Sequence, residues 1–314
     1  MGRAIEQLQH YNITLIWLLI IILAYLFFGI ASFGDKLVLS RSKNPKLYVF
    51  YVGILSLLVL LLIPFVGILL PNKVSFFWII LTSLVFILGL YFLYSAVEKF
   101  DVSRVIPIVG AIQPIFILFL SRIFFGYGAM KLNNLLALLI LLIASIIISF
   151  EKKLELNKNL LKLSLWASLL IALSFVLMKM VFLNLSFFQG IIWIGIFNFL
   201  FVLVFFFSEK FREKIFAKKS AFDKRTIFLV ILTQSAGGLG GFLQNLAIFL
   251  APAWNLAIIN ALRGIQYVFL FIITLIFSKF LPKILKEELS KKLISQKIIS
   301  IVLIVVGLYA LILG

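Results

Sequence analysis

The sequence is divided into apolar runs of about twenty residues, separated by short segments that carry most of its proline, asparagine and lysine. A helix needs about 20 apolar residues to cross a bilayer, because the hydrocarbon core is about 30 Å thick and each residue adds 1.5 Å. These runs are too long for barrel strands, which take about 10 residues and alternate in polarity. Ten runs qualify, and they predict helices over residues 13–38, 47–70, 76–97, 103–125, 133–150, 162–184, 187–208, 226–250, 253–278 and 296–313.

The composition agrees with a membrane protein. Hydrophobic residues make up 64% of the 314 residues and charged residues 13%, whereas soluble domains contain about 45–50% and about 25%. A soluble fold cannot hide that much apolar surface, which argues against a soluble enzyme or a nucleic-acid-binding protein. The chain has no cysteine and one histidine, His10. We therefore expect no metal, no cofactor and no catalytic residues.

The basic residues are distributed unevenly between the two predicted sides of the membrane. Of the 29 lysines and arginines, 23 lie in loops on one side and four on the other, and two, Lys179 and Arg263, lie inside predicted helices. Loops rich in lysine and arginine stay in the cytoplasm. We therefore predict a multi-pass protein of the plasma or inner membrane with both termini outside the cytoplasm.

The two halves of the sequence resemble each other. Residues 112–124 and 265–277 are identical at five of thirteen positions, including Gln113 and Gln266. Five helices per half is an odd number, so the second half would enter the membrane from the opposite side. The sequence therefore predicts an all-α polytopic protein of ten transmembrane helices in two inverted five-helix repeats, residues 13–150 and 162–313, joined by a charged linker, residues 151–161. Secondary transporters often have this architecture, with the substrate site near the bilayer midplane.

Several short sequence stretches are similar to those of one transporter family. They are Asp35-Lys36, Ser103 to Pro107, Lys179, Ala261 to Phe271, and Pro282 to Glu288. On these stretches the whole chain resembles the EamA-like family of the drug/metabolite transporter superfamily. The resemblance implies a ten-helix transporter whose cavity is lined by the first, third and fourth helices of each half. Two features depart from the family: Tyr127 stands where a glutamate usually follows the fourth helix, and family members are usually described with cytoplasmic termini.

Arg263 is the strongest candidate for a functional residue. It lies near the middle of the predicted helix 253–278, where a basic side chain costs roughly 2.5–3.5 kcal/mol and normally faces a cavity or a partner. Asn260 and Gln266 lie three residues before and after it, on the same helical face. We expect this face to line a cavity where Arg263 binds an anionic group. The alternative is a structural clamp onto backbone carbonyls.

Further polar residues inside the predicted helices are candidates for the same cavity. Lys179 lies some five residues from its helix end, so it either faces the cavity or extends to the membrane interface. Gln113 precedes Pro114, which frees a carbonyl in the preceding turn, and we predict that Gln113 and Gln266 act as paired donors. Gln234 is a further candidate for the cavity lining.

Five residues are candidates for structural or gating roles: Pro114, described above, and four others. The spacing of Gly237 and Gly241 predicts close helix packing, or a hinge. Asp35 and Lys36 predict either an ion pair at the membrane edge or simple anchoring on the cytoplasmic side. No acidic residue lies deep within a predicted helix, so we do not expect proton coupling through a buried carboxylate.

We therefore predict a secondary transporter or exporter of a small anionic or zwitterionic metabolite, working by alternating access of the two five-helix halves. The alternative is a flippase-like carrier of a lipid-linked sugar or phospholipid. We expect the lipid bilayer and a small-molecule substrate as partners, no nucleic acid, no enzymatic activity, and a monomer or homodimer.

Overall fold

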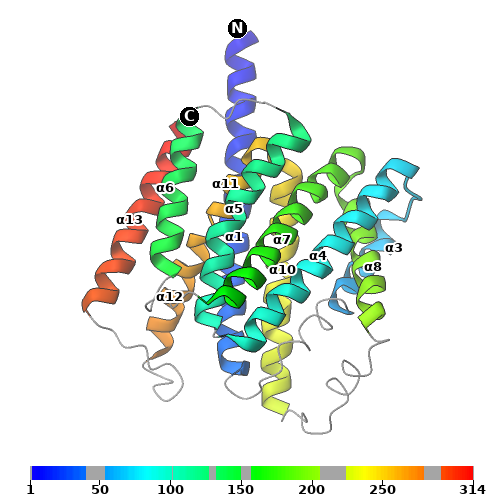
Figure 1. Cartoon of the computed structure of the whole chain (residues 1–314). Helices are drawn as coiled ribbons and strands as arrows, with labels where there is room; N and C mark the ends of the chain where they lie inside the picture. Colours follow the sequence, from blue (N-terminus) through cyan, green and yellow to red (C-terminus); the bar gives the residue numbers. More distant parts are fainter. Residues whose placement is uncertain are drawn as a thin grey trace. The chain divides into compact units, whose positions relative to one another are not determined.

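The computed structural model describes residues 2–39, 54–100, 102–126, 132–149, 157–205, 224–278 and 291–313. These residues are helical apart from short turns and contain no strand (Figure 1). The elements are α1 (Gly2–Leu39), the 3-10 helix η1 (Ser56–Leu62), α3 (Ile63–Val66), α4 (Lys73–Lys99), α5 (Val102–Phe125), α6 (Leu132–Ser149), α7 (Lys158–Asn184), α8 (Phe187–Phe205), α10 (Lys224–Leu250), the 3-10 helix η2 (Ala253–Asn255), α11 (Leu256–Ala261), α12 (Gly264–Ser278) and α13 (Lys291–Leu313).

Seven of the described segments are long and apolar enough to cross a membrane, in agreement with the predicted multi-pass helical protein. They are Ile16–Gly34, Lys73–Lys99, Arg104–Phe125, Lys158–Asn184, Phe187–Val204, Ala253–Phe277 and Ile294–Ile312. Ser56–Val66 and Leu132–Ile148 are apolar but shorter. α10 is 27 residues long and apolar over much of its length.

The helices form two compact units, each described by itself. The first contains α1, α6, α10, η2, α11, α12 and α13, and the second contains η1, α3, α4, α5, α7 and α8. Each unit therefore takes helices from both predicted halves of the sequence, so the units do not coincide with continuous stretches of chain.

α1 packs along both α10 and α12 in the first unit. It buries a stripe of residues at helical spacing, Trp17, Ile21, Ala24 and Tyr25. At Gly29 an added Cβ would lie 3.0 Å from Cβ of Phe269 on α12, so the two backbones come close together. On the other side of this unit α6 packs against α13, α12 and α11 (Figure 1).

Among the glycines of α10, Gly240 lies closest to α1. A Cβ added there would lie 3.1 Å from the Ala24 carbonyl oxygen, whereas one at Gly237 would lie 3.7 Å from Cβ of Ala31, and one at Gly241 would meet nothing within 4 Å. Close packing therefore occurs at Gly240 rather than at the predicted Gly237–Gly241 pair, because the rotation of α10 turns Gly240 toward α1. Since Gly240 faces Ala24 and Gly237 faces Ala31, α10 runs antiparallel to α1.

α7 has the corresponding position in the second unit, where it packs along α4 and α5. It is buried along much of its length. Gly89 of α4 permits the contact, since an added Cβ would lie 3.1 Å from the backbone nitrogen of Ile171. α8 packs on α4 and on η1, where the Ser56 hydroxyl donates to the Gly195 carbonyl at 2.9 Å.

The helix predicted over residues 47–70 ends early, at Val66. Gly67 has φ +67° and the chain is not helical from there to residue 72. Two side chains of α8 satisfy this stretch of backbone: Gln189 accepts from Leu69 N at 3.0 Å and donates to Gly67 O at 3.1 Å, and Trp193 donates to Leu69 O at 2.9 Å. The prediction was wrong here because these contacts come from residues more than a hundred positions away.

Candidate functional site

The helix predicted over residues 253–278 is interrupted at Leu262 and Arg263. Arg263 N bonds to Asn260 O at 3.1 Å, and Ile265 N to Leu262 O at 2.9 Å. Gln266 N bonds to Arg263 O at 3.0 Å. Each of these bonds spans three residues instead of four, which is the tighter 3-10 pattern. The prediction of one continuous helix is therefore wrong, and Arg263 lies in the turn between α11 and α12.

Side chains from two neighbouring helices satisfy the carbonyls that this turn frees. Ile259 O and Ala261 O each lose the donor that would lie four residues on. The Tyr25 hydroxyl of α1 donates to Ile259 O at 2.6 Å, and the Ser145 hydroxyl of α6 donates to Ala261 O at 2.7 Å. Sequence reasoning missed both residues, since an isolated hydroxyl in an apolar run carries no signal of the backbone it will meet.

Gly264 allows α6 to come close enough for this contact. A Cβ added at Gly264 would lie 2.6 Å from Ser145 Oγ and 3.3 Å from Ile304 Cδ1 of α13. A larger residue would push the hydroxyl away from the Ala261 carbonyl. The interruption is therefore held from both sides, by α1 and by α6.

Arg263 lies beside buried polar groups. It is half-buried and near the middle of the candidate span Ala253–Phe277. The side chains of Arg263 and Gln244 lie close enough to the Tyr25 hydroxyl to interact with it, and Tyr25 is fully buried. A guanidinium has five donors in a planar fork and can bind a carboxylate or phosphate with two parallel hydrogen bonds.

Gln266 extends this group of residues along α1. Its Nε2 donates to Ser32 Oγ at 2.9 Å. Ser32 follows Tyr25 by seven residues, about two helical turns, so both lie on one face of α1. We name Tyr25, Ser32, Gln244, Arg263 and Gln266 the α1–α12 polar cluster.

Asn260 is fully buried, and neither its Oδ1 nor its Nδ2 has a hydrogen-bond partner among the described residues. Gln244 Nε2 likewise forms no hydrogen bond within the described part of the chain, although the side chain lies near Tyr25. An unsatisfied buried polar group costs about 1–3 kcal/mol, so such groups usually meet water, an ion or a ligand. The turn also interrupts the helical face that Asn260 was predicted to share with Arg263 and Gln266.

Three other predicted residues belong to the second compact unit. Gln113 and Pro114 are buried within α5, and Lys179 is 5% exposed in α7, five residues before its end at Asn184. The burial of Lys179 argues against a side chain that reaches the membrane interface. The pairing of Gln113 with Gln266 stays a prediction.

The remaining candidates lie on α1 and α10. Gln234 is half-buried in α10, about three turns from Gln244. Asp35 and Lys36 lie within α1, which continues to Leu39, but their side chains are outside the described part of the structure. Their ion pair stays a prediction, as does any role for most of the linker 151–161.

Comparison with known proteins identifies the fold alone. No protein-family model matches the chain, and no curated protein matches it. Among solved structures, 26 chains match. One of them, titled "Crystal structure of protein", has a TM-score of 0.61 and 14% identity, and the match covers 94% of this chain and 95% of that one. The chain therefore has, over nearly its whole length, a fold already seen in solved structures.

Proposed function

We propose that this protein is a secondary transporter of a small anionic or zwitterionic metabolite, and that the α1–α12 polar cluster binds the anionic group. The observation that carries the proposal is the position of Arg263, at the interruption of an apolar candidate span and beside buried polar groups. An arginine near the middle of a membrane span is expensive, which supports a functional role.

The interrupted helix supports an anionic substrate. Discontinuous helices in transporters often point a half-helix N-terminus at an anionic substrate group. α12 begins at Gly264, directly after Arg263, so the guanidinium lies at the start of the second half of the interrupted span. Asn260 and Gln244 supply unsatisfied donors in the same unit.

The packing of the helices supports a repeat of two related halves. In the predicted repeat, α1 and α7 are the first helices, α4 and α10 the third, and α5 and α12 the fourth. α1 packs on α10 and α12, while α7 packs on α4 and α5. Each first helix thus packs on the third and fourth helices of the other half. Two structurally equivalent halves would produce this pattern if each half contributed its first helix to the other.

The direction of the helices is consistent with alternate crossing of a membrane. Tyr25 meets Ile259, and Gly29 lies against Phe269 further along α12, so α1 and the α11–α12 segment run parallel. α10 runs antiparallel to α1. These directions are those expected if the first and ninth predicted helices (α1 and α11–α12) cross the membrane in one direction and the eighth (α10) crosses it in the opposite direction. They agree with the resemblance to EamA-like transporters.

The proposal is tested by transport into proteoliposomes. The purified protein is screened for counterflow of small carboxylates, phosphorylated metabolites, amino acids and organic cations, with and without a pH gradient. We expect an anionic or zwitterionic substrate, and we expect Arg263→Ala to lower its transport at least about tenfold, since a charge-assisted bond is worth about 1.5–3 kcal/mol. Arg263→Lys should retain part of the activity.

Arg122→Ala is the matched control, because Arg122 is an exposed arginine in the last turn of α5, and it should transport normally. Transport of organic cations alone, unchanged in Arg263→Ala, would overturn the proposal. A parallel assay of fluorescent phospholipid and lipid-linked sugar translocation separates this function from the flippase-like alternative.

A further inference from the structure

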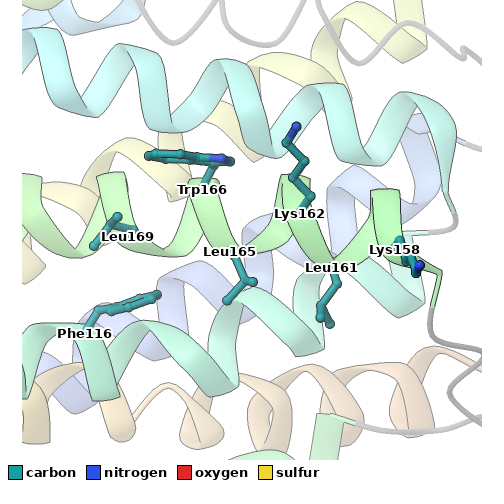
Figure 2. Close-up of a pocket in the computed structure, with 7 residues that line it drawn as sticks. All are labelled: Phe116, Lys158, Leu161, Lys162, Leu165, Trp166 and Leu169. Carbon is teal, nitrogen blue, oxygen red and sulfur yellow. The ribbon is translucent and has the colours of Figure 1, made fainter.

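The second compact unit contains an apolar groove along the outer face of α7, beside α5 (Figure 2). Its volume of about 460 Å³ is within the range of small-molecule sites, about 300–1,000 Å³. Its apolar wall is formed by Leu161, Leu165 and Leu169 of α7 and Phe116 of α5. Leu161 and Leu165 are 38% and 37% exposed, so the groove remains open along this wall.

One end of the groove is positively charged. Lys158 and Lys162 line it at the beginning of α7, and both are exposed. Residues 158, 162, 165 and 169 recur at intervals of four, three and four, which is the spacing of one helical face. This face therefore carries two lysines followed by two leucines.

The lysines are placed where a helix favours negative charge. A helix N-terminus carries a partial positive charge, so acidic side chains stabilise it and basic ones do not. The first turn of α7 contains no acidic residue, and the Asn157 side chain caps it by accepting from Asn159 N at 2.8 Å. The two ammonium groups and the helix N-terminus therefore act together on an anion at this end.

Trp166 indicates how the groove is oriented in a bilayer. It lines the groove one turn after Lys162, is 46% exposed, and stacks on Phe92 of α4 with ring centroids 6.1 Å apart. Tryptophan is enriched at the level of the lipid headgroups. The lysine end would then lie at the headgroups, and the leucine end would lie deeper, among the acyl chains.

We propose that this groove binds an anionic phospholipid, with the headgroup phosphate at Lys158 and Lys162 and an acyl chain along Leu161, Leu165 and Leu169. The charge of the lysine end complements the headgroup, and the apolar wall complements the chain. A zwitterionic lipid would bring a positive group toward the two lysines and should bind more weakly. This inference is independent of the transport substrate.

Quenching of tryptophan fluorescence tests the proposal. The full chain is reconstituted in phosphatidylcholine vesicles that contain a minor fraction of either phosphatidylglycerol or phosphatidylcholine with brominated acyl chains. The contribution of Trp166 is the difference between the unsubstituted protein and Trp166→Phe. We expect brominated phosphatidylglycerol to quench this contribution at a much lower fraction of the lipid than brominated phosphatidylcholine does.

The double variant Lys158→Gln/Lys162→Gln should lower the apparent affinity for brominated phosphatidylglycerol about tenfold or more, since a lysine near an anionic membrane surface contributes a several-fold effect. Lys73→Gln is the matched control, because Lys73 also begins a helix capped by an asparagine, Asn72, but does not line the groove. It should bind like the unsubstituted protein.

Equal quenching by the two lipids, or unchanged affinity in the double variant, would overturn the proposal. The proposal would also be overturned if Trp166 were not quenched because a second copy of the chain covers the groove. Cross-linking in the same vesicles would detect such a copy. Native mass spectrometry gives an independent readout: the protein should retain phosphatidylglycerol in preference to phosphatidylcholine, and the double variant should lose that preference.

Discussion

Tyr25 and Ser145 each supply a hydrogen bond that the backbone of α11 cannot make for itself. Inside a membrane no water replaces such a bond, so a free carbonyl there is costly. Tyr25 also lies beside Arg263, so one hydroxyl both stabilises the interruption and contacts the candidate anion-binding group. The two roles of Tyr25 can be separated by experiment.

Tyr25→Phe removes only the hydroxyl. We expect it to lower the free energy of unfolding by about 1–3 kcal/mol, because Ile259 O loses its donor in a buried setting, and to weaken substrate binding through the altered position of Arg263. Thermal unfolding in detergent and the transport assay measure the two effects. Tyr309→Phe is the control, since Tyr309 is 63% exposed on α13; an equal loss of stability there would contradict this account.

The residues of the α1–α12 polar cluster differ in how readily the sequence reveals them. Arg263 and Gln266 could be predicted because charged and amide side chains are rare in apolar runs. Tyr25 could not, because a tyrosine in such a run resembles any other aromatic residue, and its partner Ile259 is 234 positions away. Periodicity reports local structure, whereas this contact depends on which helices become neighbours.

At the scale of single elements, hydrophobic runs predicted where helices lie but not where they are interrupted. The turn at Leu262 and Arg263 has no proline within it and is followed by a single glycine, Gly264. The end of α3 at Val66 is marked by Gly67, but one glycine in an apolar run is weak evidence. Both interruptions are stabilised by side chains of other helices, so they are properties of the packed unit.

The interruption should be sensitive to Gly264. Gly264→Ala would force the Ser145 hydroxyl to shift, and we expect a loss of about 1–3 kcal/mol, the usual cost of overpacking. If the contact with Ser145 causes the loss, Gly264→Ala should cost less in a Ser145→Ala background. A double-mutant cycle of unfolding free energies measures this coupling. Additive effects would instead assign the cost to Ile304 or to the backbone.

At the scale of the whole molecule, the sequence predicted a helical membrane protein, and the seven apolar candidate spans agree. Orientation remains a prediction based on the 23 basic residues assigned to one side. The two compact units could not have been predicted, because hydrophobic periodicity carries no information about which helices pack together. The division of each sequence half between the units is therefore the main feature of the fold that was missed.

The orientation can be tested directly because the chain has no cysteine. With Gly314→Cys, a membrane-impermeant maleimide should label intact cells, since the C-terminus is predicted to lie outside the cytoplasm. Ser220→Cys, in the predicted loop with the most basic residues, should be labelled only after the cells are opened. The reverse pattern would show that the charge count misassigns the topology.

The same absence of cysteine permits a test of how α1 and α10 move. Cβ of Ala31 would lie 3.7 Å from a Cβ at Gly237, close to the mean of about 3.8 Å in disulfides. We expect Ala31→Cys/Gly237→Cys to cross-link on oxidation and still to transport. Ala31→Cys/Gly238→Cys is the control, because a Cβ at Gly238 meets nothing within 4 Å. Loss of transport on cross-linking, restored by reduction, would mean that α1 and α10 slide during the cycle.

The close approaches on both sides of α1 have a mechanical consequence. Gly29 brings α1 against α12, and Gly240 brings α10 against α1, so any sliding among these three helices would drive backbone into backbone. They should therefore move together as one rigid body, although α1 comes from the first half of the sequence and α10 and α12 come from the second. The boundary of this rigid group of helices would then differ from the boundary between the two halves of the sequence.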